Sequence, residues 1–150
     1  ASKESKSWIT SRFIRVLNDI EDSLTVNIVV FYGKNDKNKS EEIVRKCGHP
    51  NIILGPNTEN IRELSAALKR CSLVFCNNSG PMNLSVALGK PTIAILGSTH
   101  PLDWGPYGNV SIKSPVYLKS YTEDDEICAM KAIRSDRVAK IVIDKIKEII

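Results

Sequence analysis

The chain has 150 residues, of which 42% are hydrophobic and 25% are charged, a balance that excludes disordered and fibrous proteins. Its 21 basic and 17 acidic residues give a net charge of +4, too small for the dense cationic face of a nucleic-acid-binding protein. The length suits one compact domain over residues 1–150.

Helices and strands are predicted to alternate from the start of the chain. Apolar residues at helical spacing predict a helix over 8–20, and a β-branched, aromatic run predicts a buried strand over 25–32. A helix over 38–47 and a short strand over 51–54 follow. The pattern therefore begins with two strands, each preceded by a helix.

The alternation continues to the end of the chain. Asn60, with Glu63 three residues later, predicts the capped start of a helix. Further strands are predicted over 72–76, 92–96 and about 109–112, and further helices over 81–88, which Gly89 ends, and over 135–150. A turn-rich loop at 97–108 and an irregular acidic stretch separate the last elements. Such alternation predicts a doubly wound, Rossmann-like α/β fold, a parallel sheet with helices on both faces.

Metal-ligating and catalytic patterns are weak in this sequence. The four cysteines form no CxxC pair, so we expect no metal site, and Cys71 and Cys76 are predicted to be core residues of a reduced, cytosolic protein. The contiguous acidic run 123–126 favours a solvated loop or a helix start. His49 and His100 are predicted to be surface loop residues, and Trp104 is predicted to hold its loop in place.

A run of small polar residues, Asn77 to Gly80, directly follows the predicted strand 72–76. In parallel α/β sheets, ligands bind at this end of the strands, and the start of the next helix suits a phosphate. Ser79 is placed to cap that helix, Gly80 lets a ligand approach the backbone, and Pro81 is tolerated in the first turn. On the pattern alone, a simple capped turn is an equal alternative.

The stretch from Asn77 to Gly108 resembles the signature of the ADP-heptose:lipopolysaccharide heptosyltransferases. In that family, an (N)D(S/T)GPMHLAAALGKP segment leads to a strand and a GPT-P…GPYG-like loop. Lys6-Ser7-Trp8 is similar to the family's Lys-x-Trp start of a first helix, and residues 61–71 are similar to its LxELAALLKRA helix. The segment 128–133, followed by Val138, resembles the family's ending. Matches in this order extend over most of the chain.

The resemblance implies one half of a two-domain GT-B glycosyltransferase. This chain would be the carboxyl-terminal, donor-binding domain, inactive alone, with the acceptor-binding domain and its general base absent. The implied reaction is an inverting, metal-independent transfer of a sugar, heptose from ADP-heptose, to a lipopolysaccharide-core or related surface-glycan acceptor. A nucleotide-diphosphate sugar would be the substrate, and no cofactor is expected. The lipid-linked acceptor implies a cytoplasmic protein with weak peripheral association at the bacterial inner membrane.

The resemblance also implies a set of site residues. Lys6 matches the family lysine that approaches the diphosphate or sugar, where a cation would stabilise the leaving group. A solvated lysine, and ordinary turn and cap chemistry at Gly33, Glu59 and Asn60, are the alternatives. The donor-binding set implied by the resemblance is Ser2, Lys6, Gly33, Glu59, Asn60, Asn78, Ser79, Gly80, Pro81, Met82 and Asn83.

Two positions depart from the family pattern. Asn78 stands where the family has aspartate, and Asn83 where it has histidine, so a negative charge and an ionisable donor are both lost. Two alternative functions therefore stay open. One is a degenerate, non-catalytic GT-B domain that acts as an interaction module, and the other is a nucleotide-sugar epimerase of the same architecture, against which the loop at 97–108 speaks.

Overall fold

The computed structural model describes residues 4–116 and 122–150. Helices alternate with strands, as predicted. The helices are the 3₁₀ helix η1 (Glu4–Lys6), α1 (Thr10–Ser23), α2 (Lys37–Cys47), α3 (Ile61–Lys69), α4 (Gly80–Ala87), α5 (Pro101–Trp104), α6 (Glu123–Ala132) and α7 (Ser135–Ile149). The strands are β1 (Ile28–Val30), β2 (Ile52–Leu54), β3 (Val74–Asn77), β4 (Thr92–Gly97) and β5 (Val110–Lys113).

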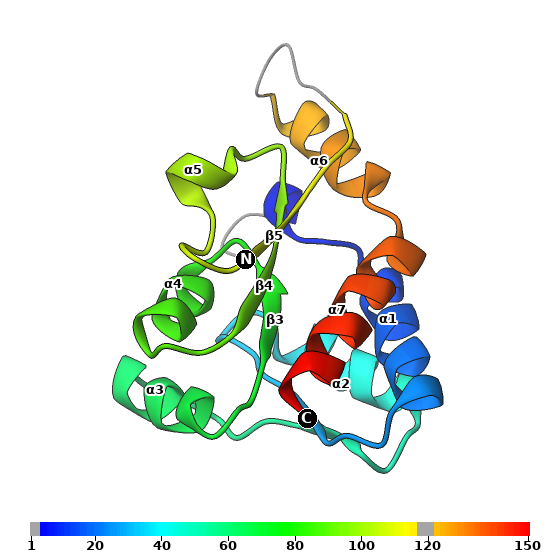
Figure 1. The fold of residues 1–150 in the computed structure, drawn as a ribbon, viewed down its shortest axis with the longest axis vertical. Helices are drawn as coiled ribbons and strands as arrows, with labels where there is room; N and C mark the ends of the chain where they lie inside the picture. The colour runs from blue at the N-terminus through cyan, green and yellow to red at the C-terminus, as the bar shows by residue number, and fades with distance from the viewer. Residues whose placement is uncertain (1–3, 117–121) are drawn as a thin grey trace.

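All strand pairs are parallel, and helices cover both faces of the β-structure, so the predicted α/β fold is confirmed. In Figure 1, α3 and α4 lie on one side of β3, β4 and β5, and α1 and α7 lie side by side on the other. The buried strand β4 lies between β3 and β5 and is inaccessible along its whole length. Burial on both faces explains why its sequence is a continuous apolar run.

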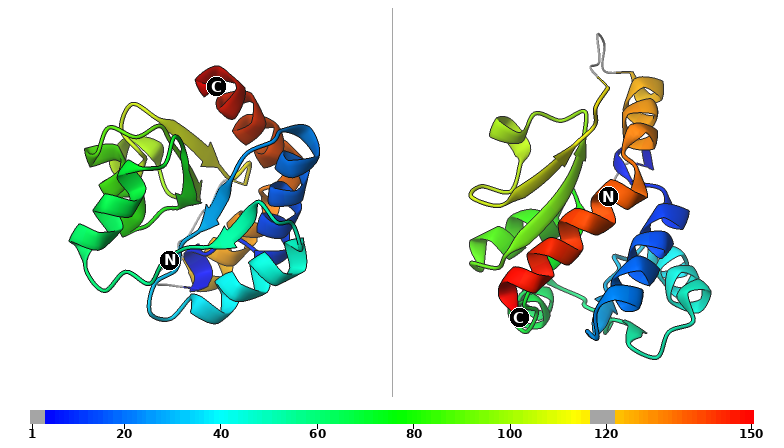
Figure 2. Two further views of the ribbon diagram at one scale, coloured as in Figure 1. Left: turned by 90° about the horizontal axis from the view of Figure 1, so that it is seen from below. Right: turned by 45° about the vertical axis from the view of Figure 1, so that its right-hand side comes forward.

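The described strands form two sheets rather than one. One sheet contains β1 and β2, and the other has the order β3-β4-β5 (Figure 2). The predicted first strand was too long, because only Ile28–Val30 pairs with the short β2, and the Gly55 N–H then bonds to the Val30 carbonyl at 2.9 Å. A single hydrophobic core still joins the sheets, since it contains Ile52 from the first sheet and Ile93 from the second.

Two short helices lie where the sequence predicted irregular chain. The acidic stretch begins α6, where the Thr122 hydroxyl accepts a bond from the Asp125 N–H at 3.3 Å and four acidic residues occupy the first turn. Negative charges at that end offset the helix dipole, so the acidic run stabilises the helix. The second helix, α5, lies in the loop at 97–108, and the imidazole of His100 accepts from the Leu102 N–H at its start.

The predicted cap of α3 is present, with one change in its bonding. The Asn60 side chain accepts bonds from the N–H groups of Arg62 and Glu63, at 3.0 and 3.1 Å. The Glu63 carboxylate returns to the Glu59 N–H at 2.8 Å rather than to that of Asn60. Gly89, with φ of 68°, follows α4 as predicted.

Several side chains differ from their predicted surroundings. Trp104 is 67% exposed, so burial of its ring does not hold the loop in place. His49 does have a partner, because its Nδ1 lies 3.0 Å from the buried carboxylate of Glu21 on α1. None of the helices in the two described ranges combines the length and the apolar composition that a bilayer-spanning helix needs.

Candidate functional site

The candidate site lies at the carboxyl ends of β3 and β4, where ligands bind in folds of this class. Asn77 ends β3, and the Asn78 N–H donates to the Ile95 carbonyl of β4 at 3.0 Å, so the two chains stay together beyond the end of β3. The polypeptide then turns at Ser79 into α4. Gly97 ends the neighbouring strand β4 at the same edge.

A single hydrogen bond brings the start of the chain to this edge. The side-chain oxygen of Asn77 accepts from the backbone N–H of Trp8 at 3.0 Å, although 69 residues separate them. Lys6 lies two residues before Trp8, and Ser79 lies two residues after Asn77. The predicted diphosphate lysine and the predicted phosphate-binding turn therefore flank one hydrogen bond.

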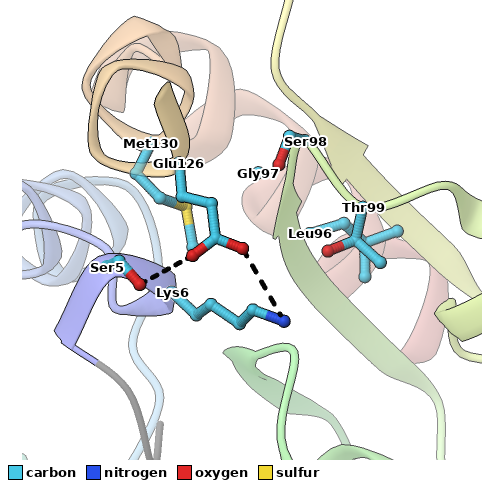
Figure 3. A pocket seen from close by; sticks show the side chains of 8 residues that line it. All are labelled: Ser5, Lys6, Leu96, Gly97, Ser98, Thr99, Glu126 and Met130. Carbon is cyan, nitrogen blue, oxygen red and sulfur yellow. Dashed lines mark hydrogen bonds and ion pairs between the residues drawn. The ribbon is translucent and has the colours of Figure 1, made fainter. Parts of the chain in front are cut away.

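Lys6 lines a small hollow between η1, the end of β4 and α6. Figure 3 shows Ser5 and Lys6 reaching toward Glu126, with Ser98 and Thr99 across the hollow. The Ser5 hydroxyl donates to the Glu126 carboxylate at 2.7 Å, and Lys6 Nζ lies 3.9 Å from the other carboxylate oxygen. The hollow measures about 10 Å³, room for about one water. A nucleotide would therefore lie across its rim and not inside it.

Ser79 occupies the N-cap position of α4 without capping it through its side chain. Its hydroxyl donates to the Asn77 carbonyl at 3.2 Å, and no side-chain cap bond forms, so the predicted cap is wrong. The Ser79 carbonyl accepts from the Met82 N–H at 3.0 Å. The start of α4 thus keeps backbone N–H groups that its own N-cap hydroxyl does not occupy, which suits an anionic ligand.

The other predicted residues of α4 differ in exposure. Gly80 and Pro81 are exposed, and a side chain added at Gly80 would meet nothing within 4 Å, so a ligand can reach the backbone there. Met82 is 1% exposed and packs against Ala94 and Leu96, with its side chain buried beneath the helix start. Asn83 is exposed and Asn78 is half-buried.

The remaining predicted residues do not line the hollow. Gly33 is exposed in the loop after β1, and the polar groups of Glu59 and Asn60 are engaged in the cap of α3. Ser2 lies outside the described residues. Within 4–116 and 122–150, no cluster of three or more His, Cys, Asp or Glu side chains is arranged to hold a metal ion.

Sequence reasoning missed Ser5, Glu126 and the segment Gly97 to Thr99 as site residues. The last of these had a usable signal, because it follows β4 just as Asn77–Gly80 follows β3, and the ends of neighbouring parallel strands meet at one edge. Ser5 and Glu126 lie 121 residues apart, and no local pattern links them.

Cys76, which immediately precedes the site, should resist alkylation in the folded protein. Burial raises the pKa of its thiol to about 12, so at about pH 8 only about one molecule in ten thousand carries the reactive thiolate. We expect iodoacetamide to modify the exposed Cys128 first and Cys76 only after denaturation. Mass spectrometry of peptides from briefly treated native protein would test the order, and early labelling of Cys76 would contradict it.

Comparison with known proteins agrees with the resemblance seen in the sequence. The profile of glycosyltransferase family 9 (heptosyltransferase) matches residues 1–133. The lipopolysaccharide core heptosyltransferase OpsX of Haemophilus influenzae is 29% identical over 122 residues, which cover 78% of this chain and 34% of that protein. Lipooligosaccharide heptosyltransferase 2 of Campylobacter jejuni is 29% identical over 73% of this chain and 34% of its own length. This chain therefore spans about a third of the length of these curated relatives.

Solved structures show the same architecture. The crystal structure of a family 9 glycosyltransferase from Veillonella parvula superposes with a TM-score of 0.73 at 26% identity, over 93% of this chain and 42% of that one. The Escherichia coli heptosyltransferase WaaC with ADP superposes with a TM-score of 0.76 at 18% identity, over 96% of this chain and 41% of that one. The fold is thus that of part of a GT-B heptosyltransferase. The chain belongs to glycosyltransferase family 9, the heptosyltransferases.

Proposed function

We propose that this chain is the carboxyl-terminal, donor-binding domain of an inverting glycosyltransferase that transfers heptose from ADP-heptose to a lipopolysaccharide-core or related surface glycan. The observation that carries the proposal is the position of Lys6, held by the Trp8–Asn77 bond at the strand edge where α4 begins. The similar WaaC structures contain ADP and ADP-2-deoxy-2-fluoro heptose, which supports a nucleotide-sugar donor here.

In this mechanism, the protein stabilises the charge that develops on the departing diphosphate. The ammonium group of Lys6 and the N–H groups at the start of α4 would supply positive potential there, which makes a metal ion unnecessary. Lys6 is suited to this exchange because its side chain is 42% exposed and its pairing with Glu126, at 3.9 Å, is loose. A diphosphate would replace that weak ion pair with a stronger one.

The groups that complete the reaction would lie elsewhere in the enzyme. We assign the general base and the acceptor site to a separate amino-terminal domain, so this domain alone should not turn over. The acceptor would be a lipid-linked glycan at the cytoplasmic face of the inner membrane, reached through weak peripheral association. No cofactor enters the proposed reaction.

Replacing Lys6 with alanine should weaken ADP binding about tenfold or more, equivalent to about 1.4 kcal/mol. The wild-type domain, as half of a site, should bind ADP with a Kd on the order of 0.1–1 mM, and UDP and GDP more weakly. Nuclear magnetic resonance titration suits this range. Lys37→Ala is the matched control, because Lys37 is 55% exposed and lies 3.7 Å from Glu41, a similarly loose pair away from the site.

Each outcome has a clear meaning. ADP binding that Lys6→Ala does not change would remove Lys6 from the site, and equal loss in Lys37→Ala would indicate nonspecific attraction. Preference for UDP or GDP would keep the glycosyltransferase and overturn the ADP-linked heptose donor. A folded domain that binds no nucleotide would favour the interaction module, for which Asn78 and Asn83 are the motivating departures.

A further inference from the structure

A second concave site lies between α1 and the start of α7, and its lining differs completely from that of the Lys6 hollow. It is a cleft of about 220 Å³ lined by Arg12 and Arg15 of α1 and by Arg134, Ser135 and Asp136. These two helices pack side by side (Figure 1). The volume is sufficient for a phosphate group and part of the molecule that carries it.

The lining of the cleft is strongly cationic. It contains three guanidinium groups and one carboxylate, which leaves two positive charges in excess. Asp136 is engaged by Arg134 through two bonds, Nε–Oδ1 at 3.0 Å and an η nitrogen to Oδ2 at 2.7 Å, and this pairing lowers the pKa of its carboxyl. The carboxylate therefore compensates Arg134 and leaves the charges of Arg12 and Arg15 without a counterion in the lining.

Arg12 and Arg15 are positioned to act on one ligand. They are three residues apart on α1, a spacing that places two side chains on the same face of a helix. The Arg12 guanidinium is fixed, because it donates to the Ile133 carbonyl, which also accepts from the Trp8 indole N–H at 3.2 Å. Arg15 is exposed and, among the described residues, makes no hydrogen bond or ion pair, so all five of its N–H donors are available.

We propose that this cleft is a phosphate-binding site, separate from the donor site, in which Arg12 and Arg15 hold the phosphate oxygens. Paired guanidinium groups favour phosphate over a simple carboxylate because their planar donors match several oxygens at once. The positive end of α7 adds to the potential in the cleft. The phosphate could belong to a soluble phosphate ester or to a phospholipid headgroup.

The test compares two exposed arginines. Inorganic phosphate and glucose 6-phosphate are titrated into ¹⁵N-labelled protein, with binding on the order of 1–10 mM expected to shift signals of Arg12, Arg15 and Ser135. Arg15→Ala should weaken that binding at least about fivefold, because it removes a charged donor group without disturbing a bond of the fold. Arg62→Ala, on the exposed side of α3, should leave it unchanged.

Further arms separate the sources of the phosphate and the two sites. Repeating the titration in Lys6→Ala excludes phosphate bound at the donor edge, since Arg15-dependent binding should persist there. Flotation with phosphatidylcholine vesicles, with and without phosphatidylglycerol, tests the headgroup. Arg15-dependent binding of either the soluble phosphates or the phosphatidylglycerol vesicles supports the site and identifies its source. Binding of neither, or equal loss in Arg15→Ala and Arg62→Ala, would overturn it.

Discussion

Replacing Trp8 with alanine should lower the free energy of unfolding by about 3–5 kcal/mol, the range for removing a large aromatic side chain from a core. Trp8 is 2% exposed and meets Phe13 and Phe75 edge-to-face, with centroid distances of 5.0 and 6.5 Å. Its indole N–H also bonds to the Ile133 carbonyl at 3.2 Å. The substitution therefore removes apolar contacts and a buried hydrogen bond together.

Trp104→Ala supplies a control with the same change in side chain. Because Trp104 is 67% exposed, its loss should change stability by no more than about 0.5 kcal/mol. Urea denaturation followed by circular dichroism measures both variants. Similar losses in the two would contradict the assignment of Trp8 as the residue that joins the start of α1 to the core.

Replacing Gly97 with alanine should destabilise the fold by about 1–3 kcal/mol, through two separate effects. Its φ of 62° lies in the left-handed region, which a side chain disfavours. An added Cβ would also come within 3.0 Å of the sulfur of Met130, which is 4% exposed and cannot move freely. Thermal and urea denaturation would measure the loss.

Gly108→Ala separates those two effects. Gly108 has a similar φ of 69°, but a Cβ there would meet nothing within 4 Å. It should therefore show only the backbone cost, about 1–2 kcal/mol, and the excess in Gly97→Ala should shrink when Met130 is also replaced by alanine. Equal losses in the two glycine variants would show that Met130 relaxes and that its contact carries no cost.

The elements that sequence predicted best are those in which local pattern and tertiary environment agree. The apolar run of β4 is buried on both faces, and the periodic residues of α7 face the core through Val138 and Val142. The pattern failed where pairing decided the outcome, since eight residues around β1 have strand character but β2 offers partners to only three. It also failed at α6, where a dense acidic start resembles a solvated loop until it is seen to offset a helix dipole.

For the candidate site, the sequence located one wall and missed the other. Asn77 to Gly80 is a continuous motif at a strand end, so its position was predictable. The bonding of Ser79 was not, because its hydroxyl has two possible partners and the choice of the Asn77 carbonyl depends on the turn geometry. Glu126 and Ser5 meet only through the packing of α6 on η1. Contacts of this kind depend on the whole fold and leave no local trace.

The bond between Ser5 and Glu126 also fixes when the site can form during synthesis. A nascent chain acquires Ser5, Lys6 and the strand ends long before Glu126 leaves the ribosome, since 121 residues separate the two partners. Until α6 emerges, Lys6 has no carboxylate to pair with, and the surface that Met130 later covers beside Gly97 is open to water. The donor edge is therefore among the last parts of this chain to be completed, after the strands that support it have been made.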